Sequence, residues 1–142
     1  MSLFLMVLMK KIKNAVRLSS LPMTISLLIL ILFRFVFLLG YVPTASMEPA
    51  LKTGSLLLGV RVWGDIQKGD IIVFQHNKEY LVKRVEAVEG DLIESNGENL
   101  VVPEGGFYVL GDNGQCSYDS RYWEYPFVMN DDIVAKVILP TR

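Results

Sequence analysis

The stretch "YLVKRVEAV", residues 80–88, has the pattern of a β-strand that carries one unusual residue. In a strand, alternate side chains share a face, so Leu81, Lys83 and Val85 are expected on the same side. The apolar members predict that this side is buried, yet Lys83 places an amine on it. Arg84, by contrast, falls on the opposite face together with a carboxylate, as expected of a solvated charge.

The rest of the chain after Pro49 continues this pattern of short strands and turns. The runs "SLLLGVRV" (55–62) and "DDIVAKVIL" (131–139) read as strands. "DLIESNGENLVV" (91–102) reads as a hairpin with Asn96-Gly97 at its tip, a strong hairpin signal. Because no segment here has a long helical period, we predict a mainly β fold: a compact all-β domain formed by a small curled sheet or barrel.

The first 47 residues of this 142-residue chain have a different composition. They contain five basic residues and no acidic one, whereas the remainder contains nine basic and fifteen acidic residues. Residues 21–42 are almost wholly apolar, which is long enough to cross ~30 Å of hydrocarbon as a helix. An arginine at the bilayer centre is costly, so we expect a span from about Arg17 to Phe33, with Arg34 at the far interface.

We therefore predict two parts: residues 1–42 as a basic flank and single transmembrane anchor, and residues 43–142 as an extracytoplasmic β-rich domain. The positive-inside rule places the N-terminus in the cytoplasm. A cleaved secretory signal is the alternative, because Thr44-Ala45-Ser46 supplies small residues after the apolar run. The apolar run is longer than the core of a typical signal, which favours the anchor.

The composition also limits the expected ligands. The basic residues lie beside the apolar run instead of forming a patch on the β domain, so no nucleic-acid partner is expected. One cysteine and one histidine are too few for a conventional zinc site, and no metal or cofactor is predicted.

Lys83 has two interpretations. It could lie at a sheet edge with its head group in water, or it could be buried to serve chemistry. Burial lowers the pKa of a lysine from its usual value of about 10.4. A lysine that is neutral near pH 7 can take a proton from a hydroxyl and act as a general base.

The candidate nucleophile is Ser46 in "PTASMEPAL" (43–51), an irregular segment bounded by prolines. Taken alone, it also reads as an ordinary loop serine. His76 is a competing candidate for the base, but "QHNKE" (75–79) has the composition of a solvated turn, which favours Lys83.

The third informative stretch is "LGDNGQCSYDSRYW", residues 110–123. It could be a hydrophilic surface loop, but it also contains large rings that would hold it in place. These rings are Tyr118, Tyr122 and Trp123. Asp119 and Arg121 are two residues apart, so they can face the same way and pair. Ser117 could orient the amine of a neighbouring lysine.

Three motifs in this order resemble type I signal peptidases: "SMEP" after the apolar run, "VKRV" in the middle, and "GDN…S.DSR.W" near the end. The resemblance implies an endopeptidase with a Ser/Lys dyad, in which Ser46 is the nucleophile and Lys83 the general base. Thr44 would help the Ser46 backbone N–H to bind the oxyanion. Ser117 would hydrogen-bond the lysine. The other implied residues are Asp119 and Arg121, which would brace the site, and Gly111, Asp112 and Asn113, which would shape the loop.

This chain departs from the family pattern at several positions. Gly114-Gln115-Cys116 stands where the family usually has Arg-Asp-Asn, and Glu124 stands in place of a glycine. Ala45 also replaces a frequent glycine. None of these changes removes a catalytic group, but they leave the shape of the loop and the substrate preference open.

The resemblance further implies removal of signal peptides from exported proteins, at the outer face of the cytoplasmic membrane of a bacterium. The expected partners are preprotein signal peptides, the lipid bilayer and, transiently, the export machinery. Other functions stay open: a dedicated peptidase for pilus assembly, conjugation or one secreted substrate, a self-cleaving repressor-type protease, or a membrane-anchored β domain without catalysis.

Overall fold

The computed structural model describes residues 3–95 and 97–139 of the chain, and the side chains of residues 3–5 and 14–19 lie outside this description. The chain divides into two compact units, Met1–Phe35 and Val36–Arg142. This division falls before the predicted boundary at residue 42, because the stretch that follows residue 35 pairs with the sheet of the second unit.

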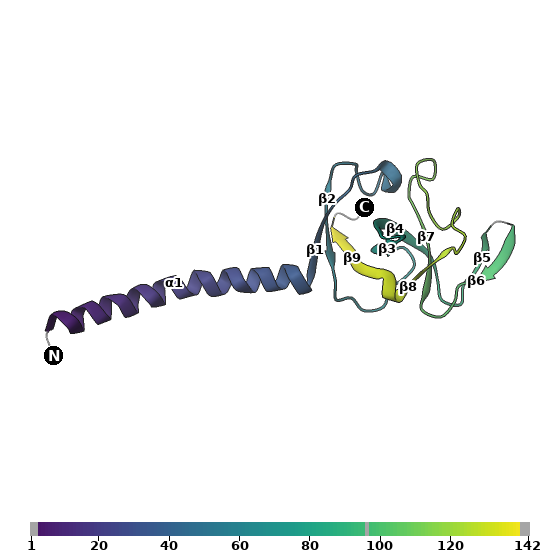
Figure 1. Ribbon diagram of the computed structural model, residues 1–142. Coiled ribbons are helices and arrows are strands. Elements are labelled where there is room, and N and C mark those ends of the chain that lie inside the picture. The colour runs from purple at the N-terminus through teal and green to yellow at the C-terminus, as the bar shows by residue number, and fades with distance from the viewer. Residues whose placement is uncertain (1–2, 96, 140–142) are drawn as a thin grey trace. The chain divides into compact units, whose positions relative to one another are not determined.

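The first unit contains one helix, α1 (Leu3–Phe35), which Figure 1 shows as a single continuous element. Leucine, methionine and lysine, which recur through it, are good helix formers. Many large apolar side chains of α1 are exposed, among them Leu21, Met23 and Leu30. The expected transmembrane span over residues 17–33 is not confirmed: within the described residues, no helix combines the length and the apolar character needed to cross a membrane.

The second unit is built on a seven-stranded antiparallel sheet, with strand order β1-β2-β9-β3-β4-β7-β8. Its strands are β1 (Phe37–Tyr41), β2 (Leu56–Val60), β3 (Ile71–His76), β4 (Glu79–Val88), β7 (Gly106–Leu110), β8 (Phe127–Met129) and β9 (Ile133–Leu139). Two single-turn 3-10 helices are η1 (Ala45–Met47) and η2 (Asn130–Asp132). The mainly β prediction is confirmed, and the sheet has two end strands, β1 and β8.

A separate two-stranded hairpin consists of β5 (Leu92–Ser95) and β6 (Glu98–Val101). The predicted hairpin over residues 91–102 is therefore confirmed. Gly97 has the positive φ of 80° that such a turn requires, which glycine adopts without steric cost. Asn96, the other predicted turn residue, lies outside the described residues.

Strands β3 and β4 form a tight hairpin that fixes the position of Lys83. Asn77 and Lys78, at its tip, have φ values of 49° and 70°, as in a two-residue type I′ turn. The resulting register places Lys83 directly opposite Ile72. Because directly opposed residues share a face of the sheet, Lys83 lies on the same face as the fully buried Ile72.

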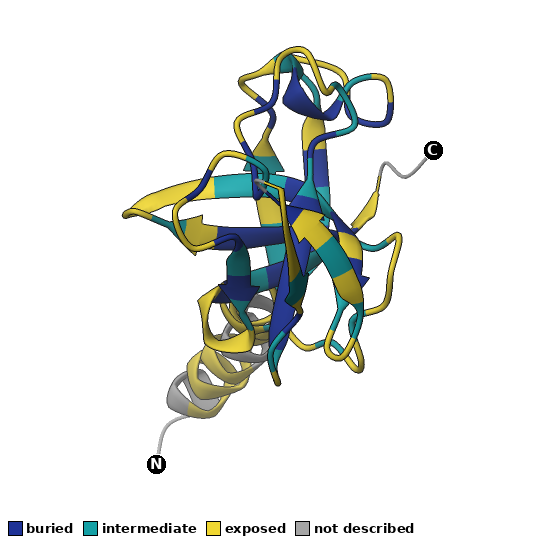
Figure 2. Cartoon of the chain, turned by 90° about the vertical axis from the view of Figure 1, so that its right-hand side faces the viewer, coloured by how far each residue is buried: buried dark blue, intermediate teal, exposed yellow. Residues whose placement is uncertain are grey.

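The core covers both faces of the central strand β3. Ile71 and Val73 belong to one buried cluster, whereas Ile72 and Phe74 belong to another that includes Trp123. Figure 2 shows the corresponding dark blue strands in the interior of this unit. Along β4, alternate residues from position 83 to position 87 are buried, so the alternation predicted from the sequence is confirmed, including its placement of a lysine inside.

Candidate functional site

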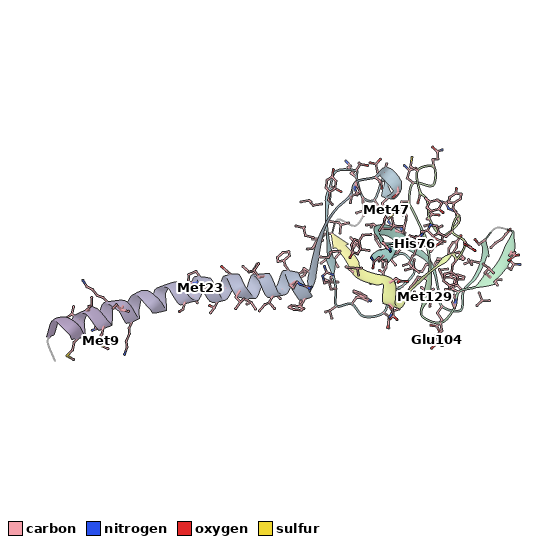
Figure 3. The ribbon with its side chains drawn as sticks, viewed as in Figure 1. Met9, Met23, Met47, His76, Glu104 and Met129 are labelled. Atoms are coloured by element: carbon pink, nitrogen blue, oxygen red, sulfur yellow. The ribbon has the colours of Figure 1, made fainter. Side chains whose placement is uncertain are left out.

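A cavity of about 770 Å³ opens in the second unit. Its walls come from β1 and the loop that follows, from the first half of β4, and from Cys116 and Tyr118 in the loop after β7. Met47 and His76, which are labelled in Figure 3, also line it. Ser46 and Lys83, the expected nucleophile and base, both lie in this cavity wall.

Ser46 lies in η1 on a loop that is fixed by its own hydrogen bonds. The η1 turn closes with a bond from the Glu48 N–H to the Ala45 carbonyl, at 3.1 Å, and the Leu51 N–H donates to the Met47 carbonyl, at 2.8 Å, directly after it. The side chains of Met47 and Leu51 are both buried. Thr44, two residues before Ser46, has extended backbone angles. The Thr44 Oγ1 lies 3.2 Å from the Ser46 Oγ, so the two hydroxyls are neighbours.

The same loop is tied at its far end through Glu48. The Glu48 carboxylate accepts hydrogen bonds from the backbone N–H and the hydroxyl of Thr53, at 3.0 Å and 2.8 Å. These bonds lower the pKa of Glu48, the backbone bond most, because they favour the ionised carboxylate. Ser46 is consequently presented by a rigid turn, with 8% of its surface exposed.

Lys83 is almost completely buried, with 3% of its surface exposed. Burial lowers the pKa of its amine below the usual value of 10.5, because the charged form loses solvation. The negative charge of Asp119 acts in the opposite direction, and the positive charge of Arg121 adds to the lowering. The interpretation of Lys83 as a residue with its head group in water is therefore wrong.

The end of the β4–β7 ladder explains how a buried lysine can still reach the cavity. Strand β7 pairs with β4 only from Arg84 onward, so the part of β4 that ends at Lys83 has no pairing with β7. Within the described residues, the Lys83 amine has no hydrogen bond or ion pair, and no direct bond joins it to Ser46. Both residues line the same cavity.

Asp119 is fully buried and accepts hydrogen bonds from three other residues. Arg121 donates through Nε and Nη2, both at 2.8 Å, the Gly111 N–H donates at 2.9 Å, and the Ser117 hydroxyl donates at 2.6 Å. Burial alone would raise the pKa of Asp119, but these hydrogen bonds outweigh it and lower the pKa. The predicted pairing of Asp119 with Arg121 is confirmed.

Ser117 thus donates to Asp119, and a hydrogen bond with Lys83, as the resemblance implied, is not present among the described residues. The oxygen of Ser117 remains able to accept a second bond, because a hydroxyl has two lone pairs.

The "GDN" loop contacts the backbone of Ser46 directly. The Asn113 N–H donates to the Ser46 carbonyl at 3.0 Å. A Cβ at Gly111 would clash with the Ser117 side chain and would lie 2.6 Å from the Ser46 carbonyl oxygen. A glycine is therefore needed at position 111, because only a residue without a side chain permits this close approach.

Arg84 has a role that the sequence analysis missed. It pairs with Asp112 through two hydrogen bonds, Nε to Oδ1 at 2.8 Å and Nη2 to Oδ2 at 2.7 Å, and also donates to the Gly69 carbonyl at 2.8 Å. The hydrogen bond with Asp112 is the main cause of a raised pKa of the Arg84 guanidinium.

The expected neighbour of Arg84 on its own strand, Glu86, instead lies 3.6 Å from Lys68. No spacing in the chain indicates that Arg84 meets Asp112, because 28 positions separate the two residues.

The sequence context of His76 suggested a position at a solvated loop tip, but the structure places this residue elsewhere. It is the last residue of β3, and its ring stacks on Trp123 with centroids 4.1 Å apart and planes 19° from parallel. The described residues contain no group of three or more His, Cys, Asp or Glu side chains that could hold a metal ion.

Comparison with known proteins gives matches over most of the chain. The profile of the family "Signal peptidase, peptidase S26" matches residues 15–102 and 95–141. Signal peptidase I of Leptolyngbya laminosa is 29% identical over 135 residues, which cover 70% of this chain and 66% of that protein. Signal peptidase IB of Staphylococcus aureus strain Mu50 is 29% identical over 138 residues, which cover 65% of this chain and 71% of that protein. The profile match includes all three motifs that carry the resemblance.

Proposed function

Because the chain belongs to the signal peptidase family, peptidase S26, we propose that it removes N-terminal signal peptides from exported proteins. We assign Ser46 as the nucleophile and Lys83 as the general base. One observation carries this assignment: a serine hydroxyl and a nearly fully buried lysine line the same cavity. The lowered pKa of Lys83 supports it, because a base must be neutral to accept a proton.

In the proposed reaction, the neutral Lys83 amine takes the proton from the Ser46 hydroxyl, and the Ser46 oxygen attacks the scissile carbonyl. A hydrogen bond between the Ser46 hydroxyl and the Lys83 amine first has to form, as catalytic hydrogen bonds often do when substrate binds. The Lys83 ammonium then protonates the leaving amine, which yields an acyl-enzyme on Ser46. Lys83, neutral again, activates the water that hydrolyses this ester.

The oxyanion would be bound by the Ser46 backbone N–H and the Thr44 hydroxyl. The 3.2 Å distance between the Thr44 and Ser46 hydroxyl oxygens supports this role. One donor of this kind is typically worth ~3 to 4 kcal/mol of transition-state stabilisation.

Asp119 would act on Lys83 from a distance. Its carboxylate stays ionised because of its hydrogen bonds, and its charge favours the Lys83 ammonium that forms during the reaction. Ser117 and Arg121 would keep the carboxylate in place, since both donate hydrogen bonds to it.

The substrate would bind as an extended strand. β1 is an end strand of the sheet, and residues 79–83 of β4 lie beyond the reach of β7. Residues 38–41 of β1 and 79–83 of β4 line the cavity, so a peptide can bind along these two segments by strand pairing. Apolar side chains such as Leu57, Val73 and Val82 line the cavity, which suits the small residues that the family accepts before the cleavage site.

We also propose that α1 attaches the protein to the cytoplasmic membrane of a bacterium, with the β domain on the outer face. The support is the row of exposed apolar side chains on α1 and the basic residues that precede them. Attachment would bring the enzyme close to membrane-inserted preproteins and raise their effective concentration. A transient contact with the export machinery would follow from the same location.

The test is cleavage of a panel of preproteins in detergent by the wild type, Ser46→Ala, Lys83→Ala and His76→Ala. We expect cleavage at the junction between signal and mature protein by the wild type and His76→Ala, and none by the other two. Activity of Lys83→Ala together with loss of activity in His76→Ala would reverse the assignment of the base. A panel in which one preprotein alone is cut would indicate a dedicated peptidase.

A further inference from the structure

The segment Cys116–Tyr118 turns alternate side chains to opposite sides. Ser117 is buried and donates to Asp119, whereas Cys116 and Tyr118 on either side of it are exposed. Both of these exposed residues line the cavity that also contains Ser46 and Lys83. One short segment thus holds the Asp119 carboxylate on one side and faces the cavity on the other.

The ring of Tyr118 is held in place although 65% of its surface is exposed. It stacks on Tyr122, with centroids 6.0 Å apart and planes 13° from parallel, and its hydroxyl donates to the Tyr122 carbonyl at 3.4 Å. The Arg121 guanidinium lies 5.5 Å from the centre of the Tyr122 ring. Since Arg121 also pairs with the buried Asp119, the exposed ring is connected to a rigid part of the site.

A large ring that is fixed in place and exposed to solvent is well suited to bind a ligand. Little side-chain freedom remains to be lost on binding, and apolar surface is removed from water when a second apolar group packs against it. An apolar or aromatic group would therefore be the preferred neighbour of Tyr118.

We propose that Tyr118, with Cys116 beside it, is a specificity-determining wall of the substrate cavity and selects an apolar or aromatic substrate side chain close to the scissile bond. This inference rests on the proposed function, because the occupant of the cavity is the peptide that Ser46 cleaves. Tyr118 contacts the substrate but takes no part in proton transfer.

The first test measures kcat and KM for signal-peptide substrates in which each residue around the scissile bond is in turn aromatic, aliphatic, Ser or Asp. At one position the wild type should prefer apolar residues by roughly two- to tenfold in kcat/KM, the range expected for an aromatic contact. Tyr118→Ala should lose this preference through KM, while Tyr118→Phe should keep it. Tyr125→Ala is the matched control, because Tyr125 is also exposed but does not line the cavity.

The proposal is overturned if the wild type shows no such preference at any position. It is also overturned if Tyr118→Ala keeps the wild-type preference, or if Tyr125→Ala loses it equally. A uniform drop in kcat for all peptides in Tyr118→Ala would indicate that the ring only supports the loop.

The second test uses Cys116 as a reporter, since it is the one cysteine in the sequence. In Ser46→Ala, which cannot turn over, a maleimide should label Cys116 several-fold more slowly when a signal peptide is bound. Fluorescence anisotropy of a labelled peptide would establish binding in the same sample. Bound peptide with unchanged labelling overturns the proposed wall.

The two tests also separate this inference from the proposed function. If the wild type cleaves preproteins, but bound peptide does not protect Cys116 and no preference depends on Tyr118, the inference alone is contradicted. The absence of both cleavage and peptide binding contradicts the proposed function and the inference together.

Discussion

The Lys83 side chain connects the fold to the proposed chemistry. Its amine loses solvation on a buried face of β4, and this loss lowers its pKa. A buried amine without an ion pair is costly while it is charged, so the fold favours the neutral form that a general base needs.

The pH dependence of cleavage should follow from this lowered pKa. The fraction of neutral Lys83 increases as the pH rises through its pKa in the folded protein, so the single-turnover rate should rise from acid to mildly alkaline pH. Because burial lowers the pKa, the midpoint should lie below 10.5. A rate that is flat across this range, with the chemical step rate-limiting, would contradict a titrating lysine as the base.

Asp119 should contribute to stability in a pH-dependent way. Its pKa is lowered in the folded protein, so the stabilisation is present above its usual value of 3.8 and is lost as the pH falls through the lower, folded-state value. Asp119→Ala should cost at most roughly 3–5 kcal/mol in free energy of unfolding at pH 7. The cost should lie towards the low end of this range, because about a third of the Arg121 side chain is exposed and can recover water.

Urea unfolding at several pH values would measure this contribution. Asp131→Ala, at an exposed position, is the control and should change the free energy of unfolding by less than about 0.5 kcal/mol. A loss in Asp119→Ala no larger than that of the control would mean that the network around Asp119 is not stabilising.

At the level of elements, two loops and one strand are joined by a few specific contacts. The loop after β7 binds the Ser46 carbonyl through Asn113 and is tied to β4 through the pair of Asp112 with Arg84. Lys83 and Arg84 are consecutive, so they lie on opposite faces of β4. One face supplies the proposed base, and the other supplies the guanidinium that holds the loop in contact with Ser46.

Arg84→Met tests this brace. It removes two charge-assisted hydrogen bonds to Asp112, so we expect a loss of about 1.5–3 kcal/mol in free energy of unfolding and a lower kcat for peptide cleavage. Lys68→Met, in the turn before β3, is the control, since the pair of Lys68 with Glu86 is exposed and should contribute at most about 1 kcal/mol. Equal effects of the two substitutions would show that the pair with Asp112 is not a brace.

The alternation along residues 80–88 predicted that Lys83 shares the apolar face of its strand, because strand geometry fixes which side chains share a face. It did not decide whether the amine is buried or reaches water. The pair of Asp119 with Arg121 was likewise predictable from a local spacing of two residues. By contrast, the contacts of Asn113 with Ser46 and of Arg84 with Asp112 join distant segments. Local patterns do not contain this information, because the fold of the sheet determines which loops meet.

At the level of the whole molecule, the second unit has its own hydrophobic core. The buried members of all three hydrophobic clusters come from residues 42–137. Composition separated a basic apolar segment from the β domain but did not locate the division at residues 35 and 36. The reason is that "FLLGY", residues 37–41, is as apolar as the helix before it and still pairs as a strand with β2.

Residues 36–142 should therefore fold without α1. We expect cooperative thermal unfolding with a Tm within a few degrees of that of the full chain, and cleavage of a soluble signal peptide at a similar kcat/KM. In sedimentation with lipid vesicles, the full chain should be recovered with the vesicles and the shortened chain should not. Equal recovery of the two would contradict attachment through α1.

In the proposed mechanism, Ser46 is activated by Lys83 and forms the covalent intermediate. The most direct measurement is rapid quenching of a reaction with an activated signal-peptide ester, followed by mass spectrometry that locates the acyl group on the chain. We predict the acyl group on Ser46 in the wild type and in Cys116→Ser, and none in Ser46→Ala or Lys83→Met. An acyl group on Cys116, or cleavage that continues in Ser46→Ala, would contradict the account.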